Sequence, residues 1–312
     1  MRCVKYRRRP GESRPVCFDL REKLQIGLPR IQLLTILIKI AIVFRKPDQL
    51  LGSGETWAQK RRRMNRRMTE LLDEQLQPTP DLLAELRLRS EQFEAATPQE
   101  ILRWAVDRFA PRFTMATAFG PEGMVILHML AQIAPDTPIF NLDTGYQFPE
   151  TLELRERVKQ RYGMEVEFKR PELTVEQYEQ LHGGPLYKTR PDQCCGDRKI
   201  RVLHQAIRGM HAWASGIRRD QSPDRAQAAI VGWDRKFGLV KVSPLARWTK
   251  KDVWKMIVDH DIPYNSLHDQ GYTSIGCWPC TRAVLLGEDE RAGRWSGFGK
   301  TECGLHTLED ER

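Results

Sequence analysis

Four of the seven cysteines in this 312-residue chain form two close pairs, Cys194-Cys195 and Cys277-x-x-Cys280. Four thiolates are enough to ligate one tetrahedral zinc ion or one cubane iron–sulfur cluster. An adjacent pair chelates a single small ion awkwardly, whereas it can place each thiolate on a different iron of a cubane. The spacing therefore favours a [4Fe–4S] cluster over zinc, with a non-catalytic domain stapled by zinc as the alternative.

Cys303 stands apart from these pairs, in a polar tail that gives its thiol no packing role. Arg291 and Arg294 precede it, and guanidinium groups near a thiol lower its pKa and favour the reactive thiolate. Glycines on both sides of Cys303 would allow the tail to move over a pocket. Cys303 is thus a candidate nucleophile, and an incidental exposed cysteine is the alternative.

Three loops that follow predicted strands could bind an anion or a nucleotide. The stretch 117–123 puts small residues and backbone N–H groups at a helix N-terminus, which suits a phosphate or a sulfate. Asp143 could hold a ribose hydroxyl or simply cap the next helix. Arg218 and Arg219 suit bidentate recognition of phosphate or sulfate, although a charged pair can also be a solvated loop.

The elements that must position these residues follow an α/β pattern. The region 69–110 reads as a helical lead-in, in which Thr97-Pro98-Gln99-Glu100 provides an N-cap and a capping box. Strands then alternate with helices through 111–290, which predicts a doubly wound, mostly parallel sheet that binds its ligand at the carboxyl ends of the strands. The predicted strands cover 113–119, 137–142, 166–168, 213–217, 228–233 and 240–242. A mobile C-terminal tail, 291–312, follows this core.

The net charge of +9 belongs to the N-terminal segment alone. Of the 50 Lys and Arg residues, 18 lie in 1–68 against 5 of the 41 Asp and Glu, which leaves 32 basic and 36 acidic side chains in 69–312. The acidic balance of 69–312 argues against nucleic acid as a partner.

We interpret 1–68 as a disordered extension or as sequence upstream of a true start at Met64 or Met68. Its apolar run, 32–44, is too short to span a bilayer. Clustered cysteines without a secretory signal indicate a reduced, cytoplasmic location.

In combination, these motifs resemble the assimilatory adenylyl-sulfate (APS) and phosphoadenylyl-sulfate (PAPS) reductase family over about residues 100 to 307. The matching motifs are Thr117–Glu122, Leu142–Gly145, Cys194-Cys195, Gly216–Ser222, Val242–Leu245 and Glu302–His306. The resemblance implies an adenine-nucleotide α-hydrolase-like fold. The two cysteine pairs match the branch that carries one [4Fe–4S] cluster per chain and generally uses APS.

The resemblance also implies a reaction and a set of site residues. APS would be reduced to sulfite and AMP through an S-sulfocysteine on Cys303, with thioredoxin as a separate electron donor. The cluster ligands would be Cys194, Cys195, Cys277 and Cys280. The substrate contacts would be Thr117, Phe119, Gly120, Asp143, Lys199, Arg218, Arg219, Arg291, Arg294 and His306.

Two other functions remain open at this point. A PAPS reductase differs only in the 3′-phosphate of its substrate. An iron–sulfur tRNA-thiolating enzyme of the same superfold would need an intact ATP-binding loop and a basic RNA surface. The sequence is compatible with a homo-oligomer, and no partner in a membrane is expected.

Overall fold

The computed structural model describes residues 75–298, 300 and 304, all of them within one compact unit, Gly54–Arg312. The segment 1–68 and its expected boundary lie outside the described residues. Among the residues that are described, no helix is long and apolar enough to cross a membrane.

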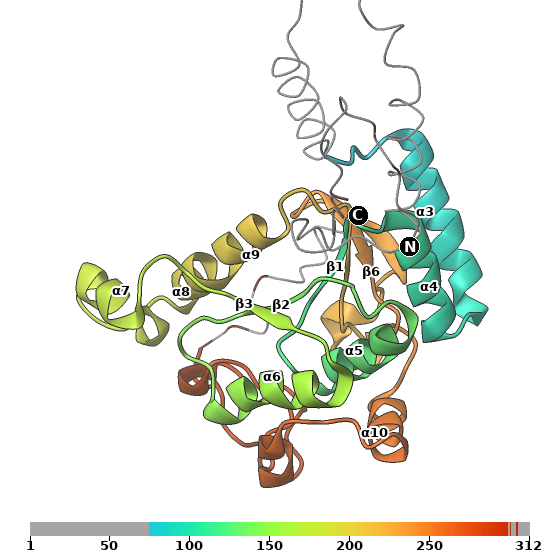
Figure 1. Ribbon diagram of the computed structural model, residues 1–312. Helices are drawn as coiled ribbons and strands as arrows, with labels where there is room; N and C mark the ends of the chain where they lie inside the picture. The colour runs from blue at the N-terminus through green and yellow to red at the C-terminus, as the bar shows by residue number, and fades with distance from the viewer. Residues whose placement is uncertain (1–74, 299, 301–303, 305–312) are drawn as a thin grey trace, which may run out of the picture. The chain divides into compact units, whose positions relative to one another are not determined.

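A six-stranded sheet with the order β3-β2-β1-β4-β6-β5 forms the centre of the unit (Figure 1). Neighbouring strands are parallel except for β5, which pairs antiparallel with β6. The predicted doubly wound, mostly parallel sheet is therefore confirmed. The strands are β1 Phe113–Ala116, β2 Ile139–Leu142, β3 Val166–Lys169, β4 Ala212–Ala214, β5 Val231–Asp234 and β6 Leu239–Val242.

Helices cover both faces of the sheet because successive strand residues point to opposite sides. In β2, Ile139 belongs to the larger core, which includes buried residues of α4, α5, α6 and α10, whereas Phe140 belongs to a second core with α9. The helices are α3 Pro80–Gln92, α4 Pro98–Phe109, α5 Pro121–Ile133, α6 Pro149–Tyr162, α7 Val175–His182, α8 Pro191–Cys195, α9 Arg201–Ala206 and α10 Lys250–Asp259.

Local sequence signals fix where several of these helices begin. The capping box predicted at Thr97 is present, with the Thr97 side chain accepting from Glu100 N and the Glu100 carboxylate accepting from Thr97 N. Thr249 and Asp252 form the same arrangement at the start of α10. These caps satisfy backbone N–H groups that no residue within the helix can reach.

Candidate active site

The turn between β1 and α5 presents backbone donors at the carboxyl edge of the sheet. Phe119 adopts a left-handed conformation, with φ of 57°, and its N–H donates to Thr117 Oγ1 at 2.9 Å. Gly120 is the N-cap of α5 without any side-chain cap. A Cβ on Gly123 would come within 2.8 Å of Thr117 Oγ1, so only glycine fits this close approach without displacement. The uncapped first turn of a 13-residue helix is a suitable anion site.

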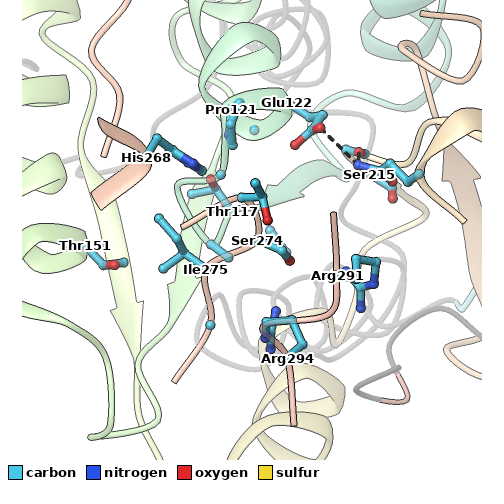
Figure 2. Close-up of a pocket in the computed structure, with 18 of the residues that line it drawn as sticks. Thr117, Pro121, Glu122, Thr151, Ser215, His268, Ser274, Ile275, Arg291 and Arg294 are labelled. Carbon is cyan, nitrogen blue, oxygen red and sulfur yellow. Dashed lines mark hydrogen bonds between the residues drawn. The ribbon is translucent and has the colours of Figure 1, made fainter. Parts of the chain in front are cut away.

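A cavity of about 230 Å³ lies in front of this turn. Residues that follow β1, β2 and β4 line it, together with the segment 273–294. Figure 2 shows Thr117 and Ser274 near the middle of the cavity, with Arg291 and Arg294 on one side. Of the substrate contacts expected from the sequence, five line this cavity: Thr117, Gly120, Lys199, Arg291 and Arg294.

Arg294 is held in place by its immediate surroundings. Its guanidinium carbon lies 4.3 Å from the centroid of the Trp295 ring, which restrains the side chain by a cation–π contact. A Cβ on Gly276 would overlap the guanidinium, so glycine at 276 is what lets the arginine reach this position. Among the described residues, the buried Nε of Arg294 has no hydrogen-bond partner. The arginine therefore has a donor to offer to a bound anion.

All four cysteines of the two pairs line a second cavity, of about 30 Å³. None of them forms a disulfide. Burial above all, reinforced by the neighbouring thiols, raises the pKa of Cys194 to about 12 and that of Cys280 to about 11. Four thiols around one small cavity, with the thiolate forms of Cys194 and Cys280 disfavoured in this way, suit a cationic group that would offset their charge. As placed here, no three Cys, His, Asp or Glu side chains in the described part of the chain group as ligands of one metal ion.

Local geometry brings the two pairs together from distant segments. Cys194 and Cys195 end α8, and a π-helical turn, Gly196–Ile200, follows directly. π-helical turns are rare and often mark functional sites. Cys277 lies opposite Gln147 in an isolated antiparallel bridge, and its Sγ is 3.2 Å from Thr144 Oγ1.

The two cavities share part of their lining. Thr144, Lys199, Cys277 and Arg294 line both of them. The turn 196–200 carries Lys199 from the end of the cysteine pair toward the larger cavity. Two cationic side chains, Lys199 and Arg294, thus lie between the larger cavity and the four thiols.

Four of the expected substrate contacts do not line the larger cavity. Phe119 is buried in the core, where its ring packs against Phe168. The Asp143 carboxylate accepts from Gly145 N at 3.0 Å and from Arg170 Nε at 2.8 Å. Arg218 is enclosed by carboxylates. A direct contact of these side chains with a substrate stays a prediction.

Arg219 does not line the larger cavity and contacts other parts of the chain. Its guanidinium donates to both carboxylate oxygens of Glu94, at 3.0 and 2.6 Å, and to the carbonyl of Ala228 at 2.9 Å. These partners belong to the lead-in region and to the loop before β5. Substrate binding by Arg219 likewise stays a prediction.

Cys303 and His306 lie outside the described residues, and their expected roles remain predictions. Two tail residues close to Cys303 are described. Lys300 pairs with Asp192, at the start of the cysteine-bearing segment, and the Gly304 carbonyl accepts from Lys236 Nζ at 2.6 Å.

Several lining residues were not expected from the sequence. Ser215 directly follows β4 and could have been found by the same strand-end logic that singled out Asp143. Arg225 lies in the same loop as Arg218 and Arg219, whose adjacent positions gave the stronger sequence signal for anion binding. His268 could not have been found from the sequence, because no motif or strand end near it indicates a binding residue.

His268 is held as a neutral acceptor at the cavity wall. Its Nδ1 is 2.6 Å from the Tyr272 carbonyl, so the proton belongs on Nδ1. Burial is the main reason why the pKa of His268 is lowered. Its buried Nε2 has no partner among the described residues and is free to accept a hydrogen bond from a ligand.

Comparison with known proteins agrees with this geometry. Residues 112–283 match the phosphoadenosine phosphosulfate reductase domain. The chain is 47% identical over 211 residues to an adenosine 5′-phosphosulfate reductase of Staphylococcus haemolyticus, covering 67% of this chain and 87% of that protein. It is 46% identical over 220 residues to a phosphoadenosine 5′-phosphosulfate reductase of Gloeobacter violaceus, covering 70% of this chain and 91% of that protein.

A solved structure supports the same relationship. The phosphate complex of the phosphoadenylyl-sulfate reductase of Candida auris is 28% identical, with a TM-score of 0.59, covering 67% of this chain and 100% of that one. The chain belongs to the phosphoadenosine phosphosulfate reductase family.

Proposed function

We propose that the chain reduces adenylyl sulfate to sulfite and AMP, with thioredoxin as the electron donor, in assimilatory sulfate reduction. The observation that carries this proposal is the shared lining of the two cavities, where Lys199 and Arg294 lie between an anion site and four cysteine thiols. Relatives named adenosine 5′-phosphosulfate reductase, 46–47% identical, support the substrate. Reduced thiols suit a cytoplasmic enzyme.

The proposed chemistry takes place at sulfur. The Cys303 thiolate attacks the sulfur of the sulfate group, the bond from that sulfur to the phosphate oxygen breaks, and AMP leaves. The product is an S-sulfocysteine. A thioredoxin thiolate then attacks the Cys303 sulfur, sulfite leaves with the bonding pair, and the second thioredoxin cysteine resolves the mixed disulfide. Thioredoxin thus supplies both electrons and becomes a disulfide.

The cationic side chains of the larger cavity address the main barrier, which is repulsion between a thiolate and an anionic sulfate. Arg291, Arg294 and Lys199 would offset that repulsion and stabilise the charge that develops on the departing phosphate. The uncapped first turn of α5 adds backbone donors for the same phosphate. The neutral Nε2 of His268 suits a hydroxyl or amino group of the nucleoside.

The four cysteines that line the smaller cavity would hold one [4Fe–4S] cluster. When bound, the cluster would supply structural and electrostatic support to the neighbouring anion site. Iron analysis and the visible absorbance of the purified protein test this assignment. Four thiols without iron, or with zinc, would contradict it.

The proposed reaction is tested by the sulfite released from APS and from PAPS, each in the presence of thioredoxin. We expect APS to be the better substrate. The relative from Gloeobacter violaceus that is named for the phosphorylated nucleotide makes PAPS the alternative, and a higher kcat/KM for PAPS would establish it.

Replacement of the proposed nucleophile is a second test. Cys303→Ser should abolish sulfite release and leave the iron–sulfur absorbance unchanged, because Cys303 is not one of the four proposed ligands. Loss of that absorbance would mean that the roles of the cysteines have been exchanged.

A further inference from the structure

The side chain of Arg218 is completely buried, and three carboxylates surround it. Its Nε donates to Glu122 Oε1 at 2.8 Å, its Nη1 pairs with the Asp220 carboxylate, and its Nη2 is 3.6 Å from Glu290 Oε1. The exposed fraction of the Arg218 side chain is 0%. A guanidinium is too costly to bury without such partners, so its position is fixed by the carboxylates.

The three carboxylates come from three different segments. Glu122 lies in the first turn of α5, Asp220 in the 3₁₀ turn after β4, and Glu290 directly before Arg291. Glu122 and Glu290 line the larger cavity, but Arg218 does not. Arg218 therefore lies behind the cavity wall and connects the segments that form it.

Further contacts tie the same loop to α5. Gln221 Nε2 donates to Glu122 Oε1 at 3.0 Å, and Arg225 Nη1 donates to Gln221 Oε1 at 2.6 Å. Gly216 lies so close to α5 that a Cβ there would be 3.1 Å from Glu122 Cβ. The loop and the helix N-terminus form one connected unit, with Arg218 among its shared partners.

Two carboxylates in the wall of an anion site require a compensating charge. Glu122 lies far from Arg294 across the cavity, and Figure 2 draws the two residues at opposite ends of the labelled lining. Without Arg218, the negative charges of Glu122 and Glu290 would repel an incoming nucleotide. Lys250, whose Nζ is 3.8 Å from Glu290 Oε2, offsets only part of that charge.

We propose that Arg218 is a positioning residue rather than a substrate ligand. It holds Glu122 and Glu290 so that the first turn of α5 and Arg291 face one bound anion, and it offsets part of the negative charge that these two carboxylates bring to the wall. This inference rests on the proposed function, because it assumes that the cavity binds an adenine nucleotide through its phosphate.

The test is a cycle of variants of the full-length protein with its iron restored, and AMP is the probe. Arg218→Met should weaken AMP binding at least about tenfold, measured by calorimetry, because the wall loses both its alignment and its charge balance. Glu290→Gln should improve AMP binding several-fold more in the Arg218→Met background than in the wild-type background, because it removes a negative charge that Arg218 no longer offsets. Such coupling is what a charge-balancing role requires.

The control is Arg247→Met, since Arg247 pairs at 3.7 Å with Glu94 and lines neither cavity. It should bind AMP as the wild type does. If Arg218→Met does not fold, Arg218→Lys carries the test, because it keeps the charge but loses the forked geometry. AMP binding should still weaken through lost alignment, and Glu290→Gln should give no larger gain in this background than in the wild type.

Equal AMP binding by Arg218→Met and Arg247→Met would overturn the inference. So would a gain from Glu290→Gln that is the same in the wild-type and Arg218→Met backgrounds. Failure of the proposed reaction is seen separately, as absence of sulfite from APS with the wild type, because AMP binding needs no reductase chemistry.

Discussion

A single hydrogen atom in place of a side chain at Gly276 gives Arg294 its position beside both cavities. Gly276→Ala would place a methyl group where the guanidinium now lies, and the flexible end of the arginine would have to move. We expect kcat/KM for APS to fall at least about tenfold, or roughly 1.4 kcal/mol, and to approach the value for Arg294→Ala. The measurement is steady-state sulfite release.

Gly232→Ala is the matched control for this prediction. Gly232 lies in β5, where an added Cβ would meet the Cβ of Ala229 at an ordinary distance of 3.5 Å. Its kinetics should stay near those of the wild type. If Gly276→Ala retained full activity while Arg294→Ala lost it, the arginine would have found an equivalent position, and the role of the glycine would be refuted.

Residue types near the site could be predicted from the sequence, but side-chain directions could not. Three arginines, Arg218, Arg219 and Arg225, lie within one short loop, and only Arg225 lines the cavity. The partner that turns Arg218 inward, Glu122, is 96 residues away in the chain. No local pattern records such a pairing, because tertiary contacts decide which guanidinium is enclosed.

At the scale of elements, the first turn of α5 depends on close contact with the end of β1. Gly123→Ala would bring a methyl group to 2.8 Å from Thr117 Oγ1, which also accepts from Phe119 N. We expect a loss of about 1–3 kcal/mol in the free energy of unfolding, as for other overpacked sites, together with weaker AMP binding. Chemical denaturation and calorimetry would measure the two effects.

The two effects can be separated by comparison with Gly232→Ala. A loss of stability without any change in AMP affinity would show that the turn tolerates the displacement of Thr117, and that its donors do not contact the phosphate. Wild-type stability would show that Thr117 moves aside freely. The first result would contradict the expected phosphate contact, and the second would contradict the close-packing argument.

The positions of helices and strands could be predicted better than side-chain contacts, because the sequence signals for helices and strands are local. The capping boxes at Thr97 and Thr249 begin α4 and α10 as their sequences indicate. β1 is shorter than the predicted strand 113–119, because the chain turns at Phe119, where φ is 57°. An apolar residue in a left-handed conformation gives no sequence signal, and its cost is met by the surrounding turn.

At the scale of the whole molecule, the cysteine pairs connect α8 with a segment that has little regular structure around Cys277. A group bound by both pairs would link these regions and stabilise the folded chain by mass action. We therefore expect removal of iron by a chelator under mild oxidation to lower the melting temperature measured by calorimetry. Cys303→Ser should show the same decrease, and an unchanged melting temperature in both proteins would argue against a structural contribution.

The pH dependence of stability follows from three histidines on different elements whose pKa is lowered. Desolvation is the largest cause that lowers the pKa of His128, His204 and His268 below the ordinary value of 6.5, and burial is least at His204, whose side chain is exposed. As the pH falls below 6.5, the unfolded chain takes up protons before the folded chain does, so the free energy of unfolding must decrease. Glu290 opposes this trend, because burial raises its pKa and the folded chain then binds a proton at that carboxyl first.

Since three histidines act against one carboxyl, we expect the urea concentration at the midpoint of unfolding to decrease as the pH is lowered from about 7.5 to about 5.5. His128→Gln should flatten that decrease whatever it does to stability at neutral pH, and a midpoint that rises on acidification would show that Glu290 outweighs the histidines.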